Sequence, residues 1–385
     1  AGKSEAAQDI FPPARDIRVQ ADRARALGTD LNQFTFTARR PEGDRWRVDV
    51  SSTETAGTLF WQERQGRIQG SVEAHFERLT LGDSDDGPDF EQPRAEGQAQ
   101  EAASTWDMDG EVDIPAIRLR VDRMRMYGRD LGSVSLVGVN EARQRRWKLE
   151  QLEIGSPHAS LKGQGVWELD GPNQGLRLKA EALFDDFGSY LDQLGFTNLV
   201  QGGHGSVRGD FEWRGIPRRF DRAGLYGELD VDLAKGRFVS VSSRSGRLLE
   251  LLSLQSVKRL AKLDWNPGGL TKQGFPFDTV QGQIKGDAGV LHSENYRVTS
   301  PVATIVMAGD ANLVDETLDI YAVVVPTFDV SGAAIAAGIA VNPIVGLGAF
   351  LTQWLLKDPV SKAMTVEYRV KGTFDQPELV EINTK

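Results

Sequence analysis

Cysteine is absent from this chain of 385 residues, and histidine occurs four times, as His75, His158, His204 and His292. The lack of cysteine excludes a disulfide framework, thiolate catalysis and cysteine-ligated zinc. No two histidines stand at metal-ligand spacing, and the sequence has no His-Glu-x-x-His motif. We therefore expect no metal site and no cofactor.

Motifs of catalysis and of phosphate binding are missing too. The sequence has no Gly-x-Ser-x-Gly elbow and no Walker-type loop, and glycine-rich strand edges commonly contain triplets such as His204-Gly205-Ser206. The aspartates between Asp83 and Asp89 lack the regular spacing and the terminal glutamate of a calcium loop. A formal net charge of −10 argues against general nucleic-acid binding, which needs a basic face. These absences predict a protein that is not an enzyme and does not bind nucleic acid.

An internal repeat is the first positive feature. The segment Ile17–Leu31 recurs 100 residues later as Ile117–Leu131, and each copy is followed by an alternating stretch and then a tryptophan, Trp46 or Trp147. Self-similarity at a fixed period indicates a repeat architecture. In the second copy the apolar phase shifts after Asp122-Arg123, which predicts a β-bulge.

Alternation of apolar and polar residues marks strands in the C-terminal half. It is clearest from Val207 to Trp213, from Leu229 to Leu233, from Ala303 to Met307 and from Met364 to Val370. Each stretch predicts a half-buried antiparallel strand with one wet face. Helical patterns are few: a short one at 185–194 and amphipathic helices at about 243–263 and 332–356.

These patterns predict a mostly β protein, built as an elongated, curved, repeat-like antiparallel sheet or groove with a few amphipathic helices near the C-terminus. The alternative is a β-sandwich, because an apolar sheet face has to fold over itself, pack on a second sheet or cover something apolar. We expect a β-repeat unit at 1–105 with a flexible acidic loop near 82–104, a second repeat unit at 106–201, and a C-terminal region at 202–385.

A series of motifs follows in the last part of the chain: Gly203–Trp213, Gly236–Phe238, Gly246–Leu254, Gly274–Asp278, Gly286–Leu291, Val323–Pro326 and Val366–Pro377. In this order they resemble the C-terminal region of the AsmA-like superfamily, and within it the YhdP branch. The resemblance covers about half of the chain, and Val366–Pro377 is its most specific piece.

The resemblance implies a periplasmic protein anchored to the inner membrane by a segment upstream of Ala1. Its β-groove would bind phospholipid acyl chains and move phospholipid between the inner and outer membranes, in support of envelope integrity. The alternative is a non-catalytic scaffold or assembly factor for outer-membrane proteins. The groove-lining candidates are the residues on the apolar phase of their strands, namely Phe211, Trp213, Leu229, Val231, Leu233, Ile305, Met307, Val366 and Tyr368.

An uncharged apolar segment runs from Val330 to Leu356 and is broken at Asn342-Pro343. Each half is too short to cross a bilayer. Three interpretations stay open: a helical hairpin that plugs the end of the sheet, an interfacial segment that dips into a membrane, and a kinked transmembrane helix. If the segment 332–356 contacts the outer membrane, the contact candidates are Ile335, Ile339, Ile344, Leu347, Phe350 and Trp354.

Tryptophans and arginines have two interpretations each. Five of the eight tryptophans are most simply core or rim residues, and the alternative is a role at a lipid–water boundary; these five are Trp46, Trp61, Trp147, Trp167 and Trp213. The arginines of the repeat most simply form the polar outer face of strands, and the alternative is contact with lipid phosphates.

Overall fold

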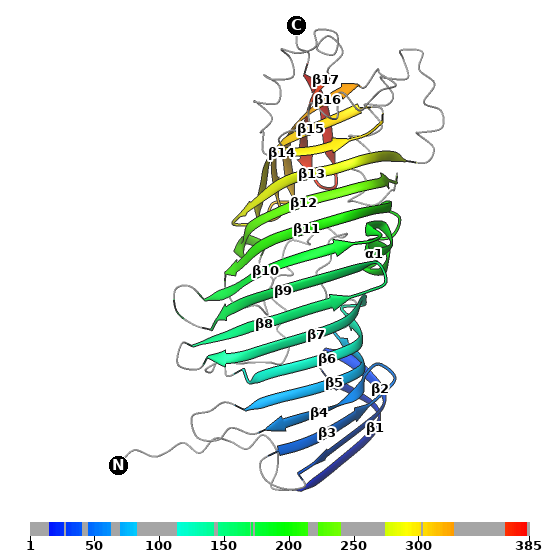
Figure 1. Ribbon diagram of the computed structural model, residues 1–385, viewed down its shortest axis with the longest axis vertical. Helices are drawn as coiled ribbons and strands as arrows, with labels where there is room; N and C mark the ends of the chain where they lie inside the picture. Colours follow the sequence, from blue (N-terminus) through cyan, green and yellow to red (C-terminus); the bar gives the residue numbers. More distant parts are fainter. Residues whose placement is uncertain are drawn as a thin grey trace.

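A computed structural model describes residues 15–26, 28–40, 45–62, 70–82, 114–141, 145–169, 171, 174–214, 222–239, 274–301, 303–326 and 366–382. These residues form one open sheet of 18 strands, in which each strand pairs with the next along the chain. The strands stack along the long axis of the molecule, from β1 at the blue end to the C-terminal strands at the red end (Figure 1). The predicted elongated sheet is thus confirmed, and the described strands belong to one sheet rather than to the two of a sandwich.

The first ten strands form two sets of five. The first set is β1 (Asp16–Ala26), β2 (Thr29–Arg39), β3 (Arg45–Ser51), β4 (Ala56–Gln62) and β5 (Ser71–Leu81). The second set is β6 (Ala116–Met126), β7 (Arg129–Glu141), β8 (Arg146–Gly155), β9 (Ala159–Glu168) and β10 (Gly175–Phe184). β1 and β6 begin 100 residues apart, so the repeat in sequence is also a repeat in structure.

The pairing of β5 with β6 is parallel, whereas all the other described pairs are antiparallel. The sequence patterns alone predicted antiparallel pairing throughout. The physical reason lies in the number of strands. Each set has five antiparallel strands, so its last strand runs in the same direction as its first. Because both sets start at the same side of the sheet, β5 and β6 run in the same direction. The predicted bulge is confirmed, since the register of β6 against β7 shifts between Val121 and Met124.

The C-terminal half continues the sheet. It consists of α1 (Phe187–Gln193), β11 (Val200–Arg214), the 3-10 turn η3 (Arg222–Gly224), β12 (Leu225–Phe238), β13 (Phe275–Asp287), β14 (Val290–Thr299), β15 (Ala303–Asn312), β16 (Thr317–Pro326), β17 (Val366–Thr373) and β18 (Pro377–Ile382). The strands expected from alternation around Val207, Leu229, Ile305 and Val366 are β11, β12, β15 and β17.

Helix α1 is the short helix predicted at 185–194. Asp186 caps it, since its carboxylate accepts a hydrogen bond of 3.0 Å from the Ser189 backbone N–H. The helix packs against the end of β10, where the ring of Phe184 meets Phe187 edge-on at 4.9 Å and Tyr190 at 5.6 Å. Figure 1 shows α1 beside the ends of the strands, and we call that side of the sheet, where β10 ends and β11 begins, the helix rim.

Part of the sequence prediction lies outside the described residues. This holds for both amphipathic helices, at 243–263 and 332–356, for the acidic loop over 83–104, and therefore for all six membrane-contact candidates. Among the described residues, no helix is long and apolar enough to span a membrane.

Candidate functional site

One face of the sheet, here called the inner face, is apolar along almost its whole length. Directly paired residues of neighbouring strands point to the same face. Following the register, one row on this face runs through Ile17, Ala38, Val48, Leu59, Ala74, Leu119, Leu136, Leu152, Gly163, Ala180, Gly209, Leu229 and Ile284. No charged residue interrupts this row from β1 to β13.

A second row continues the inner face towards the C-terminus. It runs from β12 to β17 through Leu233, Val280, Val298, Ile305, Val324 and Val366. Several of these side chains are fully buried and belong to one hydrophobic cluster with Phe184 and Tyr368. The inner face is therefore a tightly packed wall at its C-terminal end and a more open apolar surface over β7–β12, where Leu136, Leu152 and Leu229 are half-exposed.

The register places all nine groove-lining candidates on the inner face. Leu233, Ile305 and Tyr368 are buried, and the other six are half-buried. Val231 lies opposite Val207, and Met307 is two strands from Tyr368 through Ala322. Whether lipid contacts these residues stays a prediction.

Sequence reasoning missed the N-terminal part of this face. Its hydrophobic clusters are built around Trp46 and Val48 in the first set and around Phe76, Val121 and Val134 across the junction of the two sets. The signal was present, because β3 and β5 alternate as clearly as β12 does.

Glycines on the inner face make room for aromatic rings to lie flat along the sheet. A Cβ atom added to Gly138 would stand 1.9 Å from the ring of Trp147, and one added to Gly236 would stand 2.3 Å from the ring of Phe277. Gly282 stands in the same relation to Tyr296. Such glycines keep the large rings down on the sheet rather than out in the space above the inner face.

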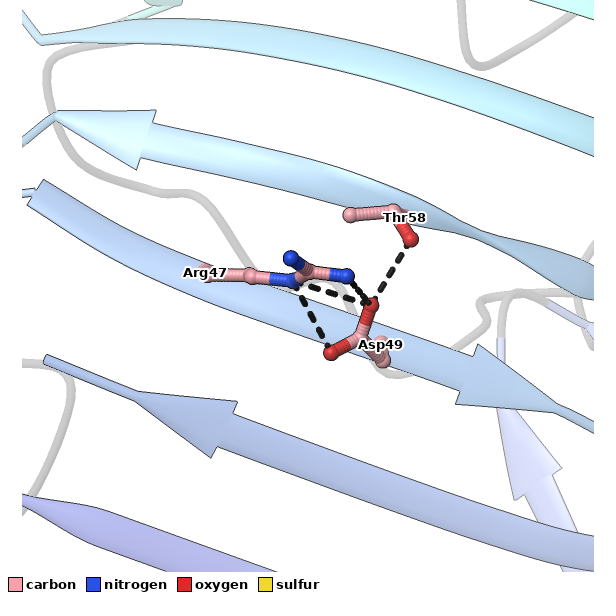
Figure 2. Close-up of polar contacts among 3 residues, drawn as sticks. All are labelled: Arg47, Asp49 and Thr58. Carbon is pink, nitrogen blue, oxygen red and sulfur yellow. Dashed lines mark hydrogen bonds and ion pairs between the residues drawn. The ribbon is translucent and has the colours of Figure 1, made fainter. Parts of the chain in front are cut away.

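The opposite, outer face is polar over most of the sheet. Arg47 and Thr58 both donate hydrogen bonds to Asp49, at 3.1 Å from Arg47 Nη2 and 2.7 Å from Thr58 Oγ1 (Figure 2). The hydrogen bonds from Arg47 hold the pKa of the Asp49 carboxyl below its usual value. Cross-strand pairs such as Lys179–Asp210 at 3.3 Å are exposed, so each contributes little stability and mainly keeps this face wet.

The outer face is buried at β14–β16, where Val306, Val323 and Val325 are at most 1% exposed. The prediction of one wet face, made from the alternation Ala303–Met307, is wrong for β15. The run Val323-Val324-Val325 is apolar on both phases, which is typical of a strand covered on both sides.

The described histidines show no catalytic arrangement. His75 lies 3.2 Å from Asp122, and His292 lies 2.7 Å from Asp310. The side chains of these two His–Asp pairs are exposed on the outer face. Within the described ranges, no three His, Asp or Glu side chains gather closely enough to hold a metal ion. What the sheet offers chemically is its inner face, which can bury apolar groups.

Sequence comparison with known proteins finds a matching family. A family described as YhdP protein matches residues 1–379. The chain is similar to a protein of Escherichia coli (strain K12) named intermembrane phospholipid transporter YhdP, with 29% identity over 230 residues. The match covers 60% of this chain and 18% of the relative's length. No solved structure matches the chain.

Proposed function

The chain belongs to the YhdP protein family, and on that premise we propose that its inner face binds the acyl chains of phospholipids as they pass between the inner and outer membranes. The relative's name speaks of phospholipid transport between membranes, and the inner face supplies a surface suited to that cargo. In this proposal the protein provides a path for lipid and catalyses no reaction, so it is not an enzyme.

The observation that carries this proposal is the unbroken apolar row from β1 to β13 on a sheet that is not closed. Soluble proteins rarely leave apolar patches of more than a few hundred Å² in water. Burial of each CH₂ group of an acyl chain contributes about 0.8 kcal/mol, so one chain of ordinary length gains on the order of 10 kcal/mol before the costs of ordering. A row that continues from strand to strand offers similar contacts at each step, which allows a lipid to move along it.

The cellular setting belongs to the same proposal. We place this part of the protein in the periplasm, with an inner-membrane anchor in a segment that this chain does not include. Contact with the outer membrane through 332–356 completes the path. A test of that contact is the binding of liposomes by the chain with and without Ile339→Ser and Phe350→Ser.

Lipid occupancy can be tested with purified protein. Organic extracts of the wild-type chain are examined by mass spectrometry beside extracts of two variants, Val231→Asp on the inner face and Asp230→Ala on the outer face of the same strand. We expect phospholipid in the wild type and in Asp230→Ala, and little in Val231→Asp, because an unpaired carboxylate in an apolar site is costly. Thermal melting confirms that the variants are folded.

Extracts free of phospholipid from the folded wild type would contradict the proposal and favour a scaffold that carries no lipid. Undiminished lipid in a folded Val231→Asp would separate the lipid from the inner face.

A further inference from the structure

Tryptophans line one side of the inner face. In β3 and β8 a tryptophan is the second residue, Trp46 and Trp147, and in β4, β9 and β11 it is the second from last, Trp61, Trp167 and Trp213. Since these strands alternate in direction, all five lie at the same side of the sheet, opposite the helix rim. The pairs Trp46–Trp61 and Trp147–Trp167 face each other directly, and Leu176 stands between Trp167 and Trp213. We call this side the tryptophan rim.

The row of tryptophans follows the direction in which a lipid would move. Neighbouring strands are about 4.8 Å apart, so the row from β3 to β11 extends over roughly 40 Å. An indole combines a large apolar ring with one N–H donor, and this combination suits a boundary between an apolar and a wet zone. Trp147 donates its Nε1–H to the Pro115 carbonyl at 3.0 Å, whereas Nε1 of Trp167 is buried without a hydrogen-bond partner.

The two rims differ in charge over β1–β11. At the tryptophan rim, the terminal strand positions and the described turn residues beside them hold Arg15, Arg39, Arg40, Arg45, Arg145, Arg146 and Arg214, with Asp16, Glu141 and Glu168. At the helix rim, the same positions hold Glu54, Asp185 and Asp186, with Arg129. Arg40 also stacks on Trp46, with its guanidinium 5.8 Å from the ring centre. Four of the rim arginines also pair with carboxylates, in Arg39–Asp16, Arg45–Glu73, Arg146–Glu141 and Arg214–Glu212. Arginines still outnumber the carboxylates at this rim, so of the two rims it is the one that favours a phosphate.

The helix rim is covered by aromatic rings at β10–β13. The rings of Phe184, Phe187 and Tyr190 pack together there, and Phe238 contacts Phe277 at 4.8 Å one step further along the sheet. This aromatic cluster leaves little room for a solvated headgroup at β10–β13. At β6–β9 the same rim has an open hollow, but its charged lining is mostly acidic, with Asp122, Asp130 and Asp192 beside Arg123, and so disfavours a phosphate.

We propose that bound phospholipids are oriented across the sheet, with their acyl chains on the inner face and their phosphate headgroups at the tryptophan rim. This inference rests on the proposed function and adds a direction to it: the headgroup leaves the sheet at one rim only. The half-exposed Trp61, Trp167 and Trp213 mark the depth at which the apolar part of the lipid ends, whereas Trp46 and Trp147 are buried. The arginines beside them attract the phosphate.

The absence of cysteine allows a direct test, because a single introduced cysteine can be labelled selectively. Gln62→Cys places a fluorophore at the tryptophan rim, and Ser51→Cys places one at the opposite end of the same strand pair; both residues are exposed strand ends on the outer face. Each labelled protein is loaded from vesicles of phosphatidylcholine that carries a nitroxide either on its headgroup or deep in its acyl chain.

We expect the headgroup nitroxide to quench the label at Gln62→Cys more strongly than the label at Ser51→Cys by about twofold or more, since the two labels are about 20 Å apart along the strands. Ser71→Cys at the tryptophan rim and Ser160→Cys at the helix rim repeat the comparison in case one variant of the first pair is unstable.

Equal or reversed headgroup quenching, with clear quenching by the acyl-chain nitroxide, would overturn the orientation and leave lipid binding in place. No quenching by either lipid in folded, labelled protein would contradict the proposed function itself. The two failures are therefore distinguishable.

Discussion

Replacing Gly138 with alanine is expected to disturb the inner face at a single defined point. Gly138 is buried on β7, and the ring of Trp147 lies across it so closely that an added Cβ would stand 1.9 and 2.2 Å from two ring atoms. The ring cannot simply move away, because Trp147 is 7% exposed and its Nε1–H is bonded to the Pro115 carbonyl.

The magnitude follows from these contacts. Overpacking of a filled site typically costs 1–3 kcal/mol, and loss of the indole hydrogen bond adds about 1 kcal/mol. We expect Gly138→Ala to lower the free energy of unfolding by about 2–4 kcal/mol. Gly286→Ala is the matched control, since the nearest atom to its added Cβ is at 3.5 Å, an ordinary contact.

Urea unfolding followed by tryptophan fluorescence measures both variants. The double variant Gly138→Ala with Trp147→Leu should recover part of the loss, because the smaller side chain vacates the space over the glycine. If Gly138→Ala is as stable as the wild type, or if both glycine variants lose the same stability, the ring does not lie over Gly138 and the account of the tryptophan rim is wrong at this point.

Two further predictions concern charged pairs. The side chains of Arg222 and Glu316 are 16% and 15% exposed, and 2.6 Å separates Arg222 Nη1 from Glu316 Oε1. Arg222→Ala should therefore lower the free energy of unfolding in urea by about 2–4 kcal/mol, whereas Arg25→Ala, which breaks an exposed pair, should lower it by less than about 0.5 kcal/mol. Equal losses in the two variants would contradict this prediction. Two hydrogen bonds from Arg369 lower the pKa of Asp319, so its contribution to stability is present at neutral pH and is lost as the pH falls through that lowered pKa. The difference in melting temperature between wild type and Asp319→Asn should therefore shrink on acidification, and a difference that grows in acid would refute the assignment.

Much of the sheet could be predicted because its signal is local. Alternation in a segment such as Val366–Val370 fixes both the strand and the face on which each side chain lies, and the two repeat copies fixed the equivalence of β1 and β6. The phase shift after Asp122-Arg123 even located the bulge.

Features that depend on distant residues could not be predicted in this way. The parallel pairing of β5 with β6 depends on the side of the sheet at which each set of strands begins. The residue pattern within either strand does not indicate this direction. The burial of Val306 on the outer face depends on what covers that face, which alternation in β15 does not reveal. The tryptophan rim needed the register of five strands, since Trp46 and Trp213 are far apart in sequence.

Photo-crosslinking from neighbouring residues of one strand tests the central claim most directly. Leu229 on the inner face and Asp230 on the outer face of β12 are each replaced by a photoreactive amino acid in cells whose phospholipids are radiolabelled. We predict labelled lipid attached to the protein at Leu229 and none above background at Asp230. Equal labelling at both positions, or labelling at Asp230 alone, would show that lipid does not travel along the inner face.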